Sequence, residues 1–154
     1  MPNPRSATLV VIEYGASWPK WLEPSNVGDV AVVAQHYEGE PSSLVTQVAS
    51  RVTKLEAMGW ELETMVLVSN GRTDPAAAAA RSILARGLLA RLGNARGGSF
   101  VLTVDEHSGA RAAHGLTALA AALDGTFGVM LSVRIGEGEP IFGRSPAPPL
   151  AAVS

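Results

Sequence analysis

The sequence predicts an α/β domain: an open, mainly parallel sheet of five strands, with helices on both faces and a shortened first crossover. Short apolar runs rich in β-branched residues alternate along the chain with segments whose apolar residues recur at helical spacing. Such runs are typical of strands that are buried on both faces, and their alternation with helices is typical of a parallel sheet. A proline-bearing stretch at 18–24 takes the place of a full helix after the first strand.

Five segments have the character of strands. The first is an almost continuous apolar run, and the others are centred on valine, leucine or isoleucine. Glycine, proline, asparagine and aspartate, which favour turns, bound most of them. The predicted strands are residues 7–12, 29–36, 60–68, 99–104 and 129–135, and Ile141 and Phe142 are candidates for a short edge strand.

Three segments have the character of helices. The first opens at Pro41 and carries an apolar stripe up to a stop signal at Gly59. The second begins with the strongest local signal in the chain, Asp74-Pro75. Aspartate caps free backbone N–H groups, and proline at the first helical position loses no hydrogen bond. That helix is expected to run to about residue 92, and the third helix to end at Gly125.

Length and composition limit the domain organisation. The 154 residues, 47% of them hydrophobic and 17% charged, suffice for one domain with a sizeable core. We predict that this domain covers residues 7–144, between an N-terminal tail at 1–6 and a flexible, proline- and alanine-rich tail at 145–154.

Charge and cysteine content exclude several functions. A net charge of −2 gives no basic footprint for nucleic acid or for an anionic membrane. The absence of cysteine excludes disulfides and thiol catalysis. No apolar run reaches membrane-spanning length, and the first residues lack the order of a signal peptide, so a cytoplasmic location is expected.

In an open parallel sheet, ligands bind beyond the carboxyl ends of the strands, where polar loops and helix N-termini gather. Polar side chains of this chain concentrate at those positions after the first four predicted strands. We therefore expect the ligand site at this edge, with no catalytic residue or cofactor assigned. The candidate ligand-binding residues are Glu13, His36, Ser69, Asn70, Arg81, Asp105 and His107.

Arg81 is the most testable member of this set. Leu84 and Leu88 mark the inward stripe of the helix that begins at Pro75, and at about 100° per residue Arg81 falls inside that stripe. An inward guanidinium near the strand ends is suited to bind a phosphate or carboxylate bidentately. The alternatives are that Arg81 extends to solvent along its stem or pairs with a local acid such as Asp105.

Two other functions stay open. A hydrolase-type enzyme would use Asp105, Glu106 and His107 together with His36. The same side chains include a two-histidine-one-carboxylate set, but no His-x-x-x-His pair marks a metal site, and none is expected. Ser108 lies outside any Gly-x-Ser-x-Gly pattern, so no nucleophile elbow is indicated.

The third function is a protein-interaction module built on the loop with Trp18 and Trp21. Aromatic rings there are suited to a ring-bearing ligand or a partner surface. The alternative is that they cover the sheet where a full helix is missing.

The usual phosphate-binding glycine motifs are absent after the first strand. Residues 43–135 nevertheless resemble the universal stress protein family, among the nucleotide-binding, Rossmann-like α/β folds. The resemblance is carried by Leu55-Glu56-Ala57-Met58-Gly59-Trp60, the strand at 61–68, Asp74-Pro75-Ala76-Ala77 and Val129-Met130-Leu131-Ser132-Val133.

That resemblance implies the fold and a binding function. ATP-binding members carry Gly-x-x-Gly, nine residues and then Gly-Ser/Thr after the fourth strand, whereas residues 108–117 have glycine only at Gly109 and Gly115. Members without the glycine pattern look like regulatory proteins that do not hydrolyse nucleotide. The leading hypothesis is therefore a non-catalytic, stress- or regulation-type binding protein, a homodimer, whose ligand is a nucleotide or another small anion.

Overall fold

The computed structural model describes residues 5–22, 31–37, 41–93, 98–125, 129–138 and 142–144. Within these ranges six strands form one sheet in the order β2-β1-β3-β4-β5-β6. The strands are β1 (Arg5–Glu13), β2 (Ala31–Tyr37), β3 (Trp60–Ser69), β4 (Ser99–Val104), β5 (Met130–Ile135) and β6 (Phe142–Arg144).

The strands from β2 to β5 are joined by parallel pairs, and β6 pairs antiparallel with β5. The predicted α/β class with a mainly parallel sheet is therefore confirmed. The predicted count of five differs from the observed sheet because Phe142–Arg144 forms the further edge strand. A segment this short, beside a glycine- and proline-containing turn, carries too little periodic signal to define a strand on its own.

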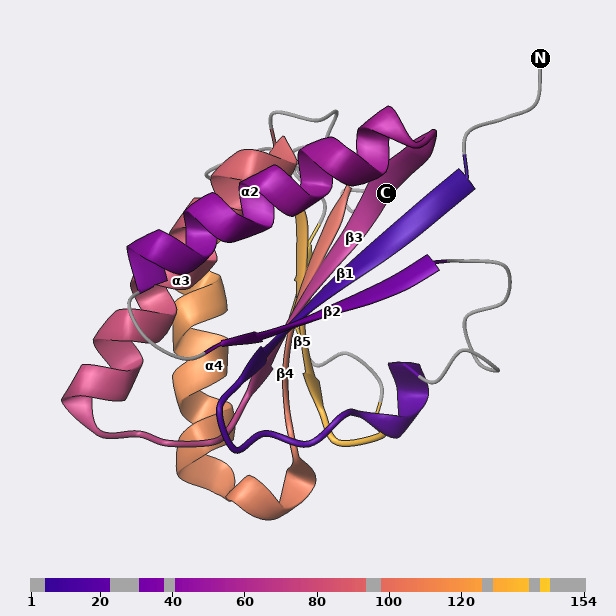
Figure 1. Cartoon of the computed structure of the whole chain (residues 1–154). Coiled ribbons are helices and arrows are strands. Elements are labelled where there is room, and N and C mark those ends of the chain that lie inside the picture. Colours follow the sequence, from indigo (N-terminus) through magenta and orange to yellow (C-terminus); the bar gives the residue numbers. More distant parts are fainter. Residues whose placement is uncertain are drawn as a thin grey trace.

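Three α-helices in the described part of the chain pack on the same face of this sheet: α2 (Pro41–Ala57), α3 (Pro75–Gly93) and α4 (Ala110–Leu123). Figure 1 shows all three on one side of the strands. Helices on both faces were predicted, and the α-helices of the described residues do not confirm this, because they cover one face. None of these helices has the length and apolarity that crossing a bilayer requires.

The strand order explains this one-sided arrangement. Crossovers between parallel strands are almost always right-handed, so the direction of travel along the sheet decides which face a helix covers. The crossovers through α2, α3 and α4 all move from the β2 edge toward β5, and they therefore share one face. Only the connection from β1 to β2 moves the other way, and its described part contains the short 3₁₀ helix η1 (Lys20–Leu22). Residues 23–30, the rest of this crossover, lie outside the described residues, so the shortened first crossover stays a prediction.

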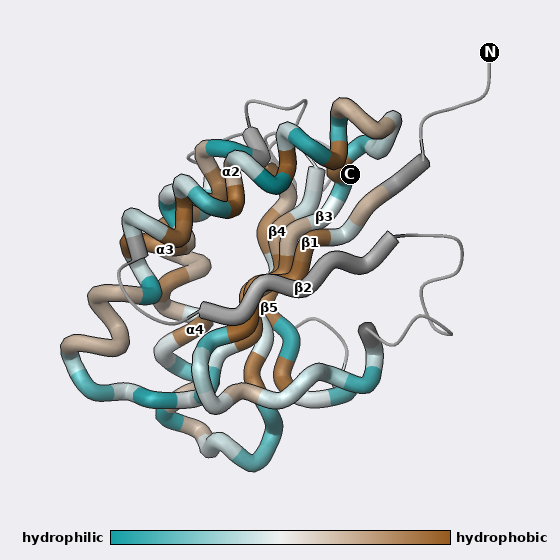
Figure 2. Tube along the Cα trace, in the orientation of Figure 1, coloured by the Kyte–Doolittle hydropathy of each residue, from teal (hydrophilic) through white to brown (hydrophobic). Residues whose placement is uncertain are grey.

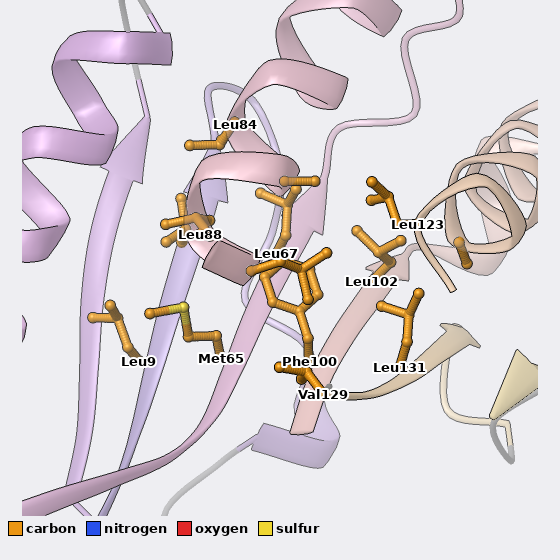
Figure 3. Close-up of a cluster of buried hydrophobic side chains, with 14 of the residues drawn as sticks. Leu9, Met65, Leu67, Leu84, Leu88, Phe100, Leu102, Leu123, Val129 and Leu131 are labelled. Atoms are coloured by element: carbon orange, nitrogen blue, oxygen red, sulfur yellow. The ribbon is translucent and has the colours of Figure 1, made fainter. Parts of the chain in front are cut away.

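The main core lies between the sheet and the three α-helices. Figure 3 shows Met65, Leu67 and Phe100 from the strands beside Leu84 and Leu88 of α3. These side chains are almost completely buried, as the apolar periodicity of both strands and helices predicts. Fully burying one such side chain contributes about 1.5–3 kcal/mol of hydrophobic stabilisation.

The opposite face of the sheet carries a smaller cluster. Val10 and Ile12 of β1 join Val66 and Val68 of β3, and Trp21 of η1 packs against them. The Trp21 ring also lies 4.4 Å from the Arg134 guanidinium carbon. Trp21 therefore covers part of this face of the sheet, as one of the two alternatives for this loop predicted.

The largest differences from the predicted strand bounds lie at the starts of β1 and β2. β1 begins at Arg5, two residues before the apolar run, because Arg5 and Ser6 continue the backbone pairing with Trp60 and Glu61 of β3. β2 runs over Ala31–Tyr37, while residues 29 and 30 of the predicted strand lie outside the described residues. Backbone pairing with a neighbour extends strands beyond their apolar pattern, which a single segment does not reveal.

Gly87 sets the contact between α2 and α3. A Cβ atom at this position would lie 2.5 Å from a methyl carbon of Val45. We predict that Gly87→Ala destabilises the protein, since overpacking costs about 1–3 kcal/mol and exceeds the roughly 0.5–1 kcal/mol that alanine gains within a helix. Urea unfolding of the variant and of the unmodified chain measures the difference.

A matched control is Gly115→Ala in α4, where an added Cβ atom would meet nothing within 4 Å. It should be neutral or stabilising. In a Val45→Ala background the cost of Gly87→Ala should largely disappear. An equal cost in both backgrounds would show that close contact with Val45 is not the cause.

Candidate functional site

The carboxyl ends of β1, β3, β4 and β5 meet at one edge of the sheet, together with the starts of α3 and α4 (Figure 1). Figure 2 shows hydrophilic segments concentrated along this edge below the hydrophobic middle of the strands. The order β2-β1-β3 places a topological switch point at the end of β1, because the chain leaves β1 and β3 in opposite directions. Ligands of doubly wound sheets bind at such points.

A buried ion pair occupies this switch point. Arg81 of α3 donates from Nε to Glu13 Oε2 at 2.7 Å and from Nη2 to Glu13 Oε1 at 2.8 Å. Glu13, the last residue of β1, is only 3% exposed and Arg81 only 8%. The two parallel hydrogen bonds give the bidentate geometry that a guanidinium and a carboxylate favour.

Other polar groups complete the pair. The backbone N–H of Asn70 donates to Glu13 Oε1 at 2.9 Å, and Arg81 Nη1 donates to the carbonyl oxygen of Arg72 at 3.1 Å. The Asn70 side chain donates to the carbonyl oxygen of Tyr14 at 2.8 Å. The ends of β1 and β3 and the second turn of α3 are therefore held in one hydrogen-bonded unit.

Arg81 thus faces inward, as its position on the helix predicted. Its partner is Glu13, whereas Asp105 was named as the local acid. Arg81 therefore does pair with an acid, as one alternative predicted, but the acid is a different one. β1 and β3 are adjacent in the sheet, and this places the end of β1 beside α3. Arg81 and Glu13 bind each other at the centre of the candidate site, and so their role is structural.

Beside this pair lies a cavity of about 510 Å³, which we call the strand-end cavity. The loop after β1 forms one wall, and the loops after β3, β4 and β5 form the others. Its lining residues are Gly15, Ala16, Ser17, Trp18, Pro19, Lys20, Val68, Ser69, Asn70, Thr103, Val104, Asp105, Glu106, His107, Ser108, Gly136 and Glu137. Its volume is typical of small-molecule sites, which fill about 300–1,000 Å³.

Four of the predicted site residues line this cavity together: Ser69, Asn70, Asp105 and His107. Sequence position alone placed them at the ends of two neighbouring strands, and the parallel pairing of β3 with β4 brings them side by side. His36 lies in β2 in register with Ile12 of β1, and its side chain lies outside the described residues.

Asp105 precedes the short helix η2 (Glu106–Ser108) at the cavity rim, and Glu106 and His107 lie within it. Asp105 Oδ1 accepts from the backbone N–H of His107 at 2.8 Å, so this carboxylate caps η2. His107 Nε2 lies 3.9 Å from Glu106 Oε1, and both side chains are exposed. Among the described residues no three histidine or acidic side chains gather in a way that would hold a metal ion.

Gly71 allows two of the cavity walls to approach closely. Its φ of +83° is a conformation that favours glycine, and a Cβ atom there would lie 2.6 Å from Ser108 Oγ. The loop after β3 therefore packs directly against η2. The Ser69 hydroxyl supports the same turn by accepting from the Gly71 N–H at 3.0 Å.

Sequence reasoning missed Lys20, Gly136 and Glu137 as lining residues, and treated Trp18 as part of an interaction loop. Gly136 and Glu137 follow β5, so the rule that located the other candidates applies to them as well. Lys20 and Trp18 lie seven and five residues beyond Glu13, the candidate at the end of β1, and only the folded loop places them against the cavity.

Comparison of the chain with family models, curated proteins and solved structures gives no match.

Removing one partner of the Glu13–Arg81 pair should leave an unpaired buried charge. We predict that Arg81→Met lowers the free energy of unfolding by about 3–5 kcal/mol. Combined with Glu13→Gln, the loss should be smaller than the sum of the two single losses, because the uncompensated carboxylate is gone. Urea unfolding of the four proteins gives the coupling.

Arg86→Met is the control for this cycle, since Arg86 is exposed on the same helix. It should change stability by no more than roughly 0.5 kcal/mol. Additive losses for Arg81→Met and Glu13→Gln would contradict a mutual interaction.

Asp74 fixes the start of α3 beside the site. Its Oδ2 accepts from the Ala77 N–H at 3.2 Å, and this hydrogen bond, followed by the nearby Arg72, lowers the pKa of the Asp74 carboxyl below its ordinary value. A lowered pKa in the folded state adds stability above the ordinary value, and this stability is lost as pH falls through the lowered pKa. We predict that the stability difference between the unmodified chain and Asp74→Ala shrinks below about pH 4. Unfolding curves across pH test this.

The comparison of Asp74→Asn with Asp74→Ala serves as the control. Asparagine still accepts the capping hydrogen bond, and neither side chain titrates in this range, so their difference should not change with pH. A constant difference between the unmodified chain and Asp74→Ala would show that the carboxylate charge adds nothing to the cap.

Proposed function

We propose that this protein is a non-catalytic binding protein of the stress or regulation type, and that its ligand is a small polar molecule with a flat ring, of the nucleoside or nucleotide class. The observation that carries the proposal is the strand-end cavity at the β1 switch point, lined by four of the residues that the sequence nominated. The universal stress protein resemblance supports the regulatory class and stays a prediction, as does the homodimer.

The lining chemistry supports a ring with hydroxyl or amino groups. Trp18 is 36% exposed and lines the cavity, so its indole face is available for stacking. Asp105, after β4, and Glu137, after β5, are exposed carboxylates in the lining. Carboxylates accept hydrogen bonds from ligand hydroxyl and amino groups. Lys20 also lines the cavity.

Ligand screening tests this proposal. We expect at least one nucleoside or nucleotide, from a panel of adenine, guanine, uracil and cytosine compounds, to raise the melting temperature of the protein, because a ligand that binds only the folded state stabilises it. Trp18→Ala should weaken that binding about tenfold or more, since stacking of a base on an aromatic ring contributes about 1–3 kcal/mol. Thermal-shift titration and calorimetry provide the readouts.

Tyr14→Ala is the matched control. Tyr14 is 72% exposed on the same loop and lies outside the cavity lining, so its removal should not change affinity. If no compound of the panel shifts the melting temperature, or if Tyr14→Ala and Trp18→Ala behave alike, the cavity proposal fails. The second candidate, an interaction module, then takes its place, because Tyr14 and Trp18 are both exposed on that loop.

A further inference from the structure

A second cavity, of about 360 Å³, lies on the helix side of the loop after β3; we call it the helix-side cavity. The start of α3 forms one wall and the first turns of α4 form the other. Its lining residues are Ser69, Gly71, Arg72, Thr73, Ala78, Arg81, Arg111, Ala112, His114, Gly115 and Leu119. Ser69 and Arg81, two of the candidate residues from the sequence, line it, and it is separate from the aromatic loop on which the proposed function depends.

The charged side chains of this lining are all basic. Arg72, Arg81 and Arg111 line it without any aspartate or glutamate. Arg81 is neutralised by Glu13, and Arg72 directs its Nε to Asp74 at 3.2 Å. Arg111 is exposed and forms no ion pair with the residues that the structure describes. The cavity therefore has an uncompensated guanidinium beside a second, partly compensated one, an arrangement that attracts an anion.

The remaining lining is largely apolar. Ala78 of α3 faces Ala112, Gly115 and Leu119 of α4, and Ala112 is buried while Leu119 is partly buried. Such a surface provides area for a short hydrocarbon or aromatic body and no polar partner for it. A bare inorganic anion would leave this part of the cavity unused.

We propose that the helix-side cavity binds an organic anion: a carboxylate or phosphate group on a small apolar body. The anionic group contacts the Arg111 and Arg72 guanidinium groups, with His114 as a further donor at the rim. The apolar body lies against Leu119 and the alanines. At about 360 Å³ the cavity lies near the lower end of the range for small-molecule sites, so the body is short.

Calorimetry and amide NMR with butyrate, hexanoate, benzoate, hexyl phosphate and inorganic phosphate test the proposal on the full chain. We expect one or more of the organic anions to bind and to shift the amide resonances of residues 111–119 and 72–73. Arg111→Gln should weaken that binding about tenfold or more, because it removes a charge-assisted hydrogen bond from the site. Arg72→Gln should act in the same direction, and the carboxylates and hexyl phosphate distinguish the two head groups.

Arg86→Gln removes an equivalent exposed charge from α3 outside the cavity and should leave binding unchanged. Three results would overturn the proposal: no organic anion shifts these resonances, Arg111→Gln binds as the unmodified chain does, or inorganic phosphate binds as tightly as the organic anions. Trp18→Ala should not affect binding in the helix-side cavity. A failure of this proposal is therefore distinguishable from a failure of the strand-end cavity proposal.

Discussion

The arrangement of the site depends on the buried Glu13–Arg81 ion pair. Burying two charges costs several kcal/mol each, and only good geometry with further hydrogen bonds offsets this cost. Glu13 meets the condition, because its two carboxylate oxygens accept from Arg81 Nε, Arg81 Nη2 and the Asn70 backbone N–H. The pair joins the end of β1, the end of β3 and the second turn of α3. The loops that leave these elements start from positions that the pair fixes.

The same pair lies next to both cavities and gives them different surroundings. The strand-end cavity takes its walls from the loops after β1, β3, β4 and β5, and its rim carries Asp105, Glu106 and Glu137. The helix-side cavity includes Arg81 and carries Arg72 and Arg111. Ser69, at the end of β3, lines both cavities, so the two lie side by side at this residue. Because Glu13 neutralises Arg81, the charge that remains for a ligand on the helix side comes from Arg111 and Arg72.

Much of this was predictable from local pattern, and the rest depended on pairing between distant segments. Buried strands, helical stripes and the Asp74-Pro75 start follow from periodicity and capping, which are local. That Arg81 faces inward also follows from the helix alone. The identity of its partner, Glu13, depends on β1 and β3 being neighbours in the sheet, and no single segment of the sequence encodes that. The one-sided helices depended on strand order in the same way. Arg111 and His114 gave one unused local signal: basic residues near the start of a helix oppose its dipole and so suggest another role.

The loop after β1 has consequences for both faces of the sheet. With no described α-helix between β1 and β2, Trp21 covers Val10, Ile12, Val66 and Val68, and Arg134 lies over its ring. The indole Nε1 of Trp21 is buried and has no hydrogen-bond partner in the described structure, an arrangement that costs about 1–3 kcal/mol. The same loop brings Trp18, Pro19 and Lys20 to the strand ends, where they form a wall of the strand-end cavity. One segment therefore sets both the covering of the sheet and the shape of the candidate site. A change in this loop that improves the covering is expected to alter the shape of the site.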